Sequence, residues 1–462
     1  MSLNGTSKTD KLFGKTVAVM GFARQGQALA RWLPTIGAHV RVSDMRPAEK
    51  LAAEMAAHPD VEFVLGGHPE SLLDGVDLLC LSGGVALDLP IVQAAVQRGI
   101  PLSNDAQLFI DRVHAPVIGI TGSAGKTTTT TLTGAIMQRS GRRTWVGGNI
   151  GDVLLDVLPQ VEPEDVVVME LSSFQLELMT TSPNTSAILN ITPNHLDRHG
   201  TMENYTRAKA QIMLHQASNE FTVLSADDAT ARSLSAAAPG SVAWFSAREI
   251  VADGAFMAGQ RLLVTGSASI DGDPRVVCER QDIPLRGDHN VLNVLAACAL
   301  TGLQNVPPTV MEATIRDFKP VAHRLELVRV LNGVTYVNDS IATAPERVVA
   351  ALRSYSEPVV LLAGGKDKKL PWEEMLRLAL NKCRAIIAFG EAGDLVVEVA
   401  QRVAGQADAV TRVATLDEAV SKAASVAQSG DVVLLSPGGT SYDAYKDFEE
   451  RGEHFRQLVA RL

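Results

Sequence analysis

The sequence predicts an α/β protein with three domains: a Rossmann-like N-terminal domain, a central mononucleotide-binding domain of the P-loop type and a Rossmann-like C-terminal domain. Three observations predict this class. Short β-branched runs alternate with turns and helical patterns, glycine-rich turns follow the first strand of the first two blocks, and 462 residues suffice for about three domains. We expect the domains at 1–104, 105–321 and 322–462, with proline-containing connectors at 100–104 and 318–322.

Composition restricts the class of protein further. With 46% apolar and 20% charged residues the chain can bury several cores, which excludes a disordered protein. A net charge of −10 argues against nucleic acid or an anionic membrane as partner. No apolar run reaches the roughly 18–20 residues of a membrane span, and the polar residues 1–11 lack a signal-peptide pattern. Four scattered cysteines indicate buried thiols in a reducing compartment, so we expect a cytoplasmic protein.

The first block predicts a nucleotide site. Its strands are expected at 16–20, 39–43 and 78–81. The turn Gly21-Phe-Ala-Arg-Gln-Gly26, with Asp44 eighteen residues further on, is similar to a dinucleotide fingerprint, although Ala23 replaces the middle glycine. The pattern fits a nucleotide diphosphate, with Asp44 or Arg46 near its ribose or base. A plain strand–helix turn is the alternative.

The second block carries the strongest local signal. Strands are expected at 117–120 and 166–169, and the first is followed by the loop Gly122, Ser123, Ala124, Gly125, Lys126, Thr127 and Thr128. Glycines allow backbone N–H groups to approach phosphate oxygens, and a helix starting near Thr127 adds partial positive charge. Lys126 can reach the β- and γ-phosphates, and the Thr127 hydroxyl can bind Mg²⁺. Ile120 stands where the usual motif has glycine, but the flanking strand and helix favour phosphate binding over a solvated turn.

Two further side chains of this block are metal-ligand candidates. Glu170 ends the strand at 166–169, and a carboxylate there can hold Mg²⁺ beside a phosphate loop. The alternative is an ordinary strand-end acid. His195 lies in the polar segment 190–199, where a neutral imidazole can bind a metal. Taken alone, a loop histidine is more often a surface residue.

The third block begins after a helical segment with two asparagines. Asn290 and Asn293 are three residues apart, hence on one helix face, where they can hydrogen-bond a purine. Alternatively, Asn290 is the N-cap of that helix. Strands of the third block are expected at 334–337, 359–363, 385–389 and 432–435.

From about Gly14 to the C-terminus the ordered segments resemble the Mur ligases of peptidoglycan synthesis. The segments are 121–128, 147–151, Glu170-Leu-Ser-Ser-Phe-Gln175, 190–198, Tyr205-Thr-Arg-Ala-Lys209, 287–290, His323-Arg324, Asn338-Asp-Ser340, 436–443 and 448–452. The Asp-Asn-Pro-Arg motif of the diamino-acid-adding members is absent, which favours the glutamate-adding branch.

The resemblance implies an ATP-dependent amide ligase that acts in peptidoglycan synthesis. The terminal carboxylate of UDP-MurNAc-L-alanine would be converted by ATP into an acyl phosphate, which the amine of D-glutamate would attack. The same reaction with L-glutamate and a folylpolyglutamate-type ligation are the alternatives. The first domain would bind the UDP of the acceptor, the second ATP with two Mg²⁺ ions, and the third the amino acid. The domains would close around the acyl phosphate, because water destroys it. A cytoplasmic monomer without nucleic-acid or membrane partners is implied.

The resemblance also assigns residues. Lys126, Glu170, His195 and Lys209 would be catalytic, and Thr127, Glu170, His195 and Lys209 would hold the two metal ions. The ATP site would add Asn290, Asn293, Arg324 and Asp339 to the phosphate loop. The acceptor would meet Gly21, Ala23, Arg24, Asp44, Arg46, Ser82, Asn149, Ser172 and Gln175. The amino acid would meet Thr343, Lys368, Ser441, Tyr442 and Phe448.

Lys209 has the form of a solvated helix lysine, and only the resemblance implies that it is carbamylated by CO₂. At an effective dielectric near 20, unit charges about 4 Å apart interact by roughly 4 kcal/mol. An ammonium would therefore be repelled by Mg²⁺, whereas carbamate oxygens would attract it. Two positions depart from the family pattern. Ile341 stands where many members carry lysine, and Ser82-Gly-Gly84 replaces Ser-Pro-Gly.

Two other classes of protein explain only part of the sequence. A nicotinamide-dependent oxidoreductase accounts for the first block but gives the phosphate loop and Glu170 no role. A regulatory NTPase accounts for the second block alone. Release of ADP discriminates among them, since a ligase hydrolyses ATP only when both the acceptor and glutamate are present.

Overall fold

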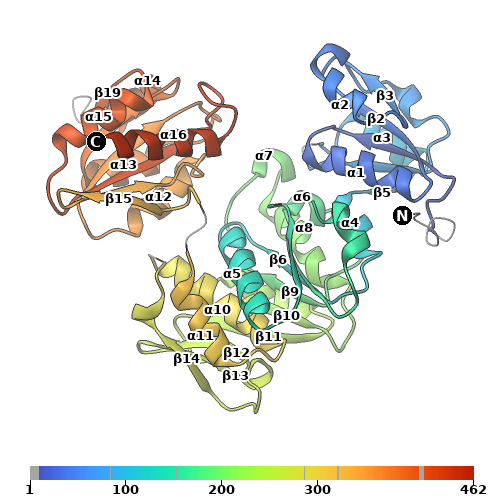
Figure 1. Ribbon diagram of the computed structural model, residues 1–462, viewed down its shortest axis with the longest axis horizontal. Coiled ribbons are helices and arrows are strands. Elements are labelled where there is room, and N and C mark those ends of the chain that lie inside the picture. The colour runs from blue at the N-terminus through green and yellow to red at the C-terminus, as the bar shows by residue number, and fades with distance from the viewer. Residues whose placement is uncertain (1–9, 84, 152, 286, 320–321, 405–409) are drawn as a thin grey trace. The chain divides into compact units, whose positions relative to one another are not determined.

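A computed structural model describes residues 10–83, 85–151, 153–285, 287–319, 322–404 and 410–462 (Figure 1). The chain divides into two compact units: residues up to 283 together with 291–317, and residues 284–290 together with 318–462. The first unit contains two β-sheets and the second contains one, each with helices around it. The predicted three-part α/β class is therefore confirmed. None of the described helices is both long and apolar enough to span a bilayer.

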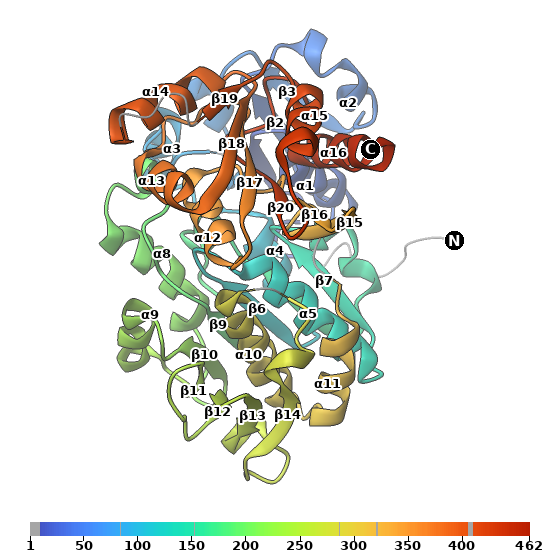
Figure 2. The same ribbon diagram turned by 90° about the vertical axis from the view of Figure 1, so that its left-hand side faces the viewer.

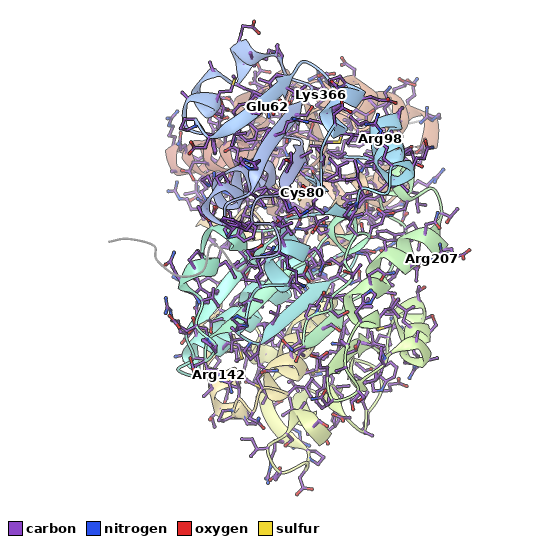
Figure 3. All side chains as sticks on the ribbon, turned by 90° about the vertical axis from the view of Figure 1, so that its right-hand side faces the viewer. Glu62, Cys80, Arg98, Arg142, Arg207 and Lys366 are labelled. Atoms are coloured by element: carbon purple, nitrogen blue, oxygen red, sulfur yellow. The ribbon has the colours of Figure 1, made fainter. Side chains whose placement is uncertain are left out.

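The N-terminal sheet is entirely parallel. Its strands lie in the order β3 (Val61–Leu65), β2 (His39–Asp44), β1 (Thr16–Met20), β4 (Leu78–Leu81) and β5 (Leu102–Ser103). Side chains alternate between two cores: Val17 and Val19 pack with α1 (Arg24–Thr35), whereas Ala18 and Met20 pack with α3 (Pro90–Gln97). Cys80 of β4 is fully buried in this layer (Figure 3). Strand order reverses between β1 and β4, so a crevice is expected at their carboxyl ends.

The connector expected at 100–104 contains structure that the sequence did not indicate. Leu102 and Ser103 form β5 by pairing with Leu79 and Cys80, because a proline is tolerated just before an edge strand. The remaining helical elements around this sheet are η2 (Ala48–Lys50), α2 (Ala52–Ala56), η3 (Glu70–Leu73) and α4 (Asp105–Ile110). Gly84 and residues 320–321 of the second connector lie outside the described residues.

The central sheet has nine strands. They lie in the order β14 (Arg275–Glu279), β13 (Arg261–Thr265), β12 (Gly254–Ala258), β11 (Ser241–Ser246), β10 (Phe221–Ser225), β9 (Thr185–Ile188), β6 (Val117–Thr121), β8 (Val166–Glu170) and β7 (Thr144–Gly148). All neighbouring strands from β7 across β6 to β12 pair in parallel, whereas β13 pairs antiparallel with both β12 and β14. Every residue of β6 and β8 is buried, as expected for strands covered on both faces.

Helices surround the central sheet. They are α5 (Lys126–Arg139), η4 (Leu154–Asp156), η5 (Leu158–Gln160), α6 (Ser173–Leu176), α7 (Leu196–His199), α8 (Met202–Leu214), α9 (Ala229–Ser233), η6 (Leu234–Ala237), η7 (Gly266–Ala268), η8 (Arg280–Asp282), α10 (Asp288–Gly302) and α11 (Pro308–Asp317). Because α10 starts at Asp288 and the Asn290 N–H bonds the Gly287 carbonyl at 3.0 Å, Asn290 lies inside the helix. The alternative that Asn290 is the N-cap is therefore wrong.

The C-terminal sheet has six strands. Their order is β15 (Glu326–Leu331), β16 (Val334–Asn338), β20 (Val432–Gly438), β17 (Val359–Gly364), β18 (Cys383–Phe389) and β19 (Val410–Arg412), with β15 antiparallel and the rest parallel. The helices are α12 (Pro345–Arg353), α13 (Glu373–Lys382), α14 (Gly393–Ala404), α15 (Leu416–Val426) and α16 (Phe448–Arg461).

Helices cover both faces of the C-terminal sheet: α12, α13 and α14 lie on one face, and α15 and α16 on the other (Figure 2). Leu361 packs into the first of these cores and its neighbour Leu362 into the second, as the alternation of a strand requires. The loops after β16, β17 and β20 therefore share the carboxyl edge of this sheet.

Candidate active site

The phosphate loop connects β6 to α5, as the sequence predicts, although the helix begins at Lys126 and not at Thr127. Gly125 has a φ of +86°, and a Cβ there would lie 2.2 Å from Oδ1 of Asn293. Glycine is thus required both by the left-handed backbone and by the close approach of the amide. Thr128 is buried in the first turn of α5. A glycine turn that opens a helix N-terminus fits the phosphates of a nucleotide.

A second loop holds the phosphate loop in place. Asn190 accepts from the Ala124 N–H at 2.9 Å through Oδ1 and donates to the Ala124 carbonyl at 3.1 Å. The Asn190 carbonyl accepts from the Ser123 N–H at 3.0 Å, and the Ser123 hydroxyl donates to the Thr192 carbonyl at 2.9 Å. Sequence reasoning quoted Asn190 within a motif without giving it this role. Asn190 follows β9, a strand that the sequence analysis did not predict, and the pairing of β9 with β6 is known only from the structure.

Glu170 is the central side chain of the site. It is 2% exposed; its Oε2 accepts from the Thr127 hydroxyl at 2.8 Å, and its Oε1 accepts from Nδ2 of Asn149 at 2.8 Å. Lys126 is half-buried and donates from Nζ to the Gly122 carbonyl at 2.8 Å. Carboxylate and hydroxyl oxygens are ligands that Mg²⁺ prefers, so this donor set fits a magnesium ion beside the loop.

Lys209 is buried beside the phosphate loop, and not solvated as its sequence context indicates. The side chain is on α8, with Nζ donating to the Gly122 carbonyl at 2.9 Å and to the Thr121 hydroxyl at 3.3 Å. Nζ also lies 4.7 Å from the ring centroid of Tyr205. Burial and then the charge of Lys126 hold the pKa of Lys209 well below its usual range, while the charge of Glu170 opposes the shift. A larger neutral fraction makes this amine a nucleophile.

His195 has a different setting. It precedes α7 with a φ of +53°, and its exposed ring meets the ring of Phe174 edge-on at 5.1 Å. The ring of Phe174 also contacts His199. This histidine is buried, stacks on Phe174 at 5.3 Å and shares a 3.0 Å hydrogen bond with the Ser173 hydroxyl. Within the described ranges, no group of three or more His, Cys, Asp or Glu side chains could hold a metal ion.

The N-terminal crevice lies where the sheet order predicts. Gly21 follows β1 with a φ of +85°, and a Cβ there would lie 2.3 Å from the hydroxyl of Ser82, which follows β4. The carboxylate of Asp44 accepts from the Phe22 N–H at 2.7 Å and from Nε of Arg46 at 2.8 Å. The hydrogen bonds from Arg46 hold the pKa of Asp44 well below its usual range. Asp44 and Arg46 therefore form a charged pair beside the crevice.

Arg24 links this turn to the central sheet. It is exposed at the start of α1, next to the exposed N-cap Ala23, and its guanidinium donates to the Asn149 carbonyl at 3.0 Å and to the Gly151 carbonyl. Since the Asn149 side chain bonds Glu170, Asn149 connects the turn after β1 to the carboxylate at the end of β8.

Ser172 and Gln175 form a capping box at the start of α6. The Gln175 N–H donates to the Ser172 hydroxyl at 3.2 Å, and Oε1 of Gln175 accepts from the Ser172 N–H at 3.1 Å. Nε2 of Gln175 lies 3.4 Å from both oxygens of Asp105. Burial raises the pKa of Asp105 to about 6. A small pocket adjoins this box, lined in part by Ser82, Asn104, Phe174, Gln175 and Arg198.

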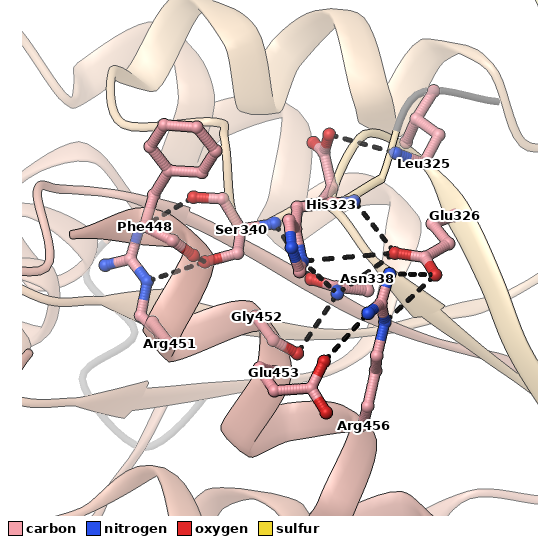
Figure 4. Close-up of polar contacts among 11 residues, drawn as sticks. His323, Leu325, Glu326, Asn338, Ser340, Phe448, Arg451, Gly452, Glu453 and Arg456 are labelled. Atoms are coloured by element: carbon pink, nitrogen blue, oxygen red, sulfur yellow. Dashed lines mark hydrogen bonds and ion pairs between the residues drawn. The ribbon is translucent and has the colours of Figure 1, made fainter. Parts of the chain in front are cut away.

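In the second unit, Asp339 follows β16. Its carboxylate accepts from the Ser436 hydroxyl at 2.8 Å and from the Leu325 N–H at 3.2 Å. Burial raises the pKa of Asp339 to about 6, and the charge of nearby Arg324 opposes this. Asp339 and Arg324 are thus brought together, as the resemblance implies. Beside them, Asn338 bonds Nδ1 of His323 at 2.9 Å (Figure 4).

Four of the amino-acid candidates lie on loops at the same edge of the C-terminal sheet, and the fifth, Phe448, is the first residue of α16. Nζ of Lys368 donates to the Thr343 hydroxyl at 3.2 Å, and the Phe448 carbonyl accepts from the Ser340 hydroxyl at 2.8 Å. Ser441 is 2% exposed, whereas Tyr442 is 69% exposed. Residues Asn190, Tyr205, Asp105 and Arg451 were absent from the sequence-based candidates, and all four owe their positions to contacts distant in sequence.

Comparison with family models covers most of the chain. Residues 15–104 match the Mur ligase MurD-like N-terminal domain, residues 120–301 the Mur ligase middle domain, and residues 323–439 the Mur ligase glutamate ligase domain. Among solved structures, UDP-N-acetylmuramate–alanine ligase from Thermotoga maritima has a TM-score of 0.59 at 18% identity, covering 97% of this chain and 99% of that one. A pseudomurein peptide ligase type C from Methanothermus fervidus has a TM-score of 0.57 at 18% identity, covering 97% and 100%. At such identity these structures establish the fold alone.

Curated relatives are much closer in sequence. The UDP-N-acetylmuramoylalanine–D-glutamate ligase of Pelotomaculum thermopropionicum is 40% identical over 97% of this chain and 98% of the relative. The protein of the same name from Symbiobacterium thermophilum is 43% identical over 96% and 98%, and that of Clostridium botulinum strain Langeland is 37% identical over 100% of both chains. With full-length relatives at this identity and three matching domain models, the chain belongs to the Mur ligase family.

Proposed function

We propose that this chain is an ATP-dependent ligase that adds D-glutamate to UDP-N-acetylmuramoyl-L-alanine. Its full-length relatives carry the name of that activity. The observation that carries the proposal in the structure is the carboxylate of Glu170, which is shared by the Thr127 hydroxyl of the phosphate loop and the Asn149 amide on the acceptor side. A single side chain thus joins the place where a triphosphate fits to the place where we assign the acceptor.

The phosphate loop and its neighbours are assigned to ATP and magnesium. The loop N–H groups and Lys126 would hold the phosphates, and the Thr127 hydroxyl with the Glu170 carboxylate would hold Mg²⁺. The ion, when bound, supplies positive charge that offsets the repulsion between two anions. His195 would hold the second of two ions. Asn290, Asn293, Arg324 and Asp339 would complete the ATP site.

The reaction joins a carboxylate to an amine in two steps. A carboxylate oxygen of the acceptor attacks the γ-phosphorus, the bond to the β-phosphate oxygen breaks, and ADP leaves. The glutamate amine then attacks the acyl carbon, loses a proton, and phosphate leaves. Lys126 would stabilise the charge on the transferred phosphoryl group, and alignment of the reactants supplies on the order of 7–11 kcal/mol of barrier reduction.

Lys209 is proposed to be a carbamate. An ammonium at Lys209 would first lose one proton. The neutral amine would then attack CO₂ and release a second proton, so that a buried cation becomes an anion. The change removes an ammonium from beside Lys126 and supplies oxygens that a metal ion prefers. Burial favours the modification, since the low pKa of Lys209 raises the fraction of reactive amine at neutral pH.

The substrates divide among the three proposed domains, 1–104, 105–321 and 322–462. The crevice residues Gly21, Ala23, Arg24, Asp44, Arg46 and Ser82 would hold the UDP part of the acceptor, and Asn149, Ser172 and Gln175 its remainder. Thr343, Lys368, Ser441, Tyr442 and Phe448 would surround glutamate. Because ATP and nucleotide sugars are cytoplasmic metabolites, we propose that the enzyme is cytoplasmic. We also propose that it is a monomer.

Release of ADP tests the proposal. Purified protein would be given ATP and Mg²⁺, with and without UDP-MurNAc-L-alanine, D-glutamate or L-glutamate. We expect ADP only when the acceptor and D-glutamate are both present, and inhibition by UDP. Turnover without the acceptor would indicate a regulatory NTPase, preference for L-glutamate would reverse the stereochemistry, and insensitivity to UDP would favour a folate-type substrate.

A further inference from the structure

A buried arginine lies at the carboxyl edge of the C-terminal sheet. Arg451 belongs to the start of α16 and is 0% exposed. Its guanidinium donates from Nε to the Ser340 hydroxyl at 3.0 Å and from one terminal nitrogen to the Ser340 carbonyl at 2.8 Å (Figure 4). The other terminal nitrogen donates to the Thr440 and Gly439 carbonyls at 2.9 and 3.2 Å. Among the residues that the structure describes, its hydrogen-bond acceptors include no carboxylate.

Burying the Arg451 guanidinium at this position costs folding free energy. A cation near a helix N-terminus opposes the helix dipole, and a buried charge without a contacting counter-charge pays a desolvation penalty. Burial lowers the pKa of Arg451 to about 10, so the guanidinium remains charged at neutral pH. A hydrophobic side chain would avoid that penalty but would leave the Gly439, Thr440 and Ser340 carbonyls without this donor. The charge and the fork of donors are therefore retained for a reason other than packing.

Arg451 joins the loops that carry the amino-acid candidates. Ser340 follows β16, two residues before the loop reaches Ala342 and Thr343, and its hydroxyl both accepts from Arg451 and donates to the Phe448 carbonyl. Thr440 precedes Ser441 after β20. The Thr440 and Lys366 backbones exchange two hydrogen bonds of 2.8 Å, which attaches the loop that leads to Lys368. Gly365 allows this convergence, since a Cβ there would lie 2.7 Å from the guanidinium.

The same edge also carries the cations Arg347, at the start of α12, and Lys368. Partial desolvation lowers the pKa of Lys368, the charges of Arg347 and Arg451 lower it further, and Glu346 opposes them. Asp443 and the Tyr445 hydroxyl act on Arg451 itself. Arg347 and Arg451 thus both repel the Lys368 ammonium, which donates to the Thr343 hydroxyl. A ligand with two carboxylates would relieve this repulsion.

We propose that Arg451 is a positioning residue for the amino-acid substrate: it holds the loops after β16, β17 and β20 to the start of α16, and its charge, without touching the ligand, favours an amino acid with two carboxylates. The inference rests on the proposed ligase function and adds a residue to it. It also gives a physical reason why the site would accept glutamate in preference to its uncharged amide, glutamine.

Steady-state kinetics of the full chain test this role. Arg451→Lys keeps the charge and loses the fork of donors, whereas Arg451→Met loses both. Arg384→Met is the matched control, because Arg384 pairs with buried Asp431 at 2.5 and 3.0 Å at the opposite end of the sheet. We expect Arg451→Met to raise the KM for glutamate by about tenfold or more, with the KM values for ATP and acceptor changed by less than about threefold.

The charge is tested separately by comparing glutamate with glutamine. The ratio of their kcat/KM values should fall in Arg451→Met and be kept in Arg451→Lys, although the KM for glutamate rises in both. Arg384→Met should lower the Tm and leave the KM for glutamate unchanged. If Arg451→Met does not fold, the KM for glutamate of Arg451→Lys is compared with that of Arg384→Met, and this comparison alone tests the inference. Parallel rises in all three KM values, or an unchanged KM for glutamate in the Lys variant, would overturn the inference. A wild-type chain that releases no ADP with glutamate would instead overturn the proposed function.

Discussion

Thr127 and Glu170, which are 43 residues apart in the chain, are joined by a 2.8 Å hydrogen bond from the hydroxyl to Oε2. The bond connects the first turn of α5 to the end of the neighbouring strand β8. It places a hydroxyl and a carboxylate, two oxygen ligands that suit a hard divalent cation, on one side of the phosphate loop. The structure thereby makes the role of Glu170 accessible to a direct test.

Glu170→Gln should abolish most activity while keeping the fold. The amide oxygen can still accept from the Asn149 amide, and the amide nitrogen can donate to a rotated Thr127 hydroxyl, but the side chain lacks the charge that a metal ion requires. We expect kcat to fall by about 10²–10³, with the Tm changed little. Glu164→Gln, an exposed residue before the same strand, is the control and should behave as the wild type. Activity of the Glu170 variant close to that of the wild type would show that this carboxylate holds no catalytic metal.

Lys209→Ala should also be inactive, and a small carboxylate such as acetate should restore part of the activity by replacing the carbamate oxygens. Arg207→Ala is the control on the same helix, because Arg207 is exposed and pairs only with Glu203 among the contacts described. Mass spectrometry of the native protein should detect one added CO₂ on the peptide that contains Lys209. Wild-type turnover of the Lys209 variant, or its inactivity with no rescue at any carboxylate concentration, would contradict the carbamate.

Asp105 should make the stability of the protein depend on pH. Burial raises the pKa of Asp105 from 3.8 to about 6, so the folded state binds this proton more tightly than the unfolded state. Stability is therefore greatest below pH ~4 as far as this group is concerned, and it falls as the pH rises to ~6. The full loss is about 2–3 kcal/mol, since one pKa unit corresponds to about 1.4 kcal/mol.

Asp105→Asn should remove this dependence. The difference in unfolding free energy between variant and wild type, measured with denaturant at several pH values, should shift in favour of the variant between pH ~4 and ~6 and then stay constant. Asp60→Asn, at an exposed carboxylate, serves as the control. A difference that is the same at every pH would mean that Asp105 titrates normally.

Local sequence patterns predicted the parts of the site that lie within one strand–turn–helix unit. The phosphate loop from Gly122 to Thr128 and the position of Glu170 follow from a glycine turn and a strand end, because parallel strands bring their carboxyl ends to one edge. Short β-branched runs likewise predicted the strands that carry these groups, and every residue of β6 and β8 is buried.

Side chains whose environment depends on distant segments could not be predicted in the same way. Lys209 has a polar helical context, yet α8 packs it beneath Thr121 and Gly122. Arg451 follows two glutamates and has the pattern of an exposed helix residue, yet carbonyls from two loops enclose it. The alternative that Asn290 is an N-cap fails for a local reason, since α10 already starts at Asp288. Burial of a charge is a property of the whole fold, and a single sequence does not display it.

Arg347 should take over the charge that many Mur ligases place at the position of Ile341. Its guanidinium donates to the Ile341 carbonyl at 3.2 Å, and its charge lowers the pKa of Lys368 and opposes the upward shift of Asp339. Arg347→Met should therefore reduce kcat/KM by about 5- to 30-fold, as expected for the loss of about 1–2 kcal/mol from a partly screened cation. Steady-state assays of ADP release would measure the effect.

A second substitution separates the charge of Arg347 from its packing. Ile341→Lys in the Arg347→Met background returns a cation to the same loop from a different residue, so it should recover a large part of the lost activity. Ile341→Met in that background changes the side chain without adding charge and should recover none. Arg353→Met, on the same helix and paired with Glu374 at 3.3 Å, should leave kcat/KM unchanged. If the lysine restores no more than the methionine, the charge of Arg347 does not replace the family's lysine, and the loop tolerates Ile341 for another reason.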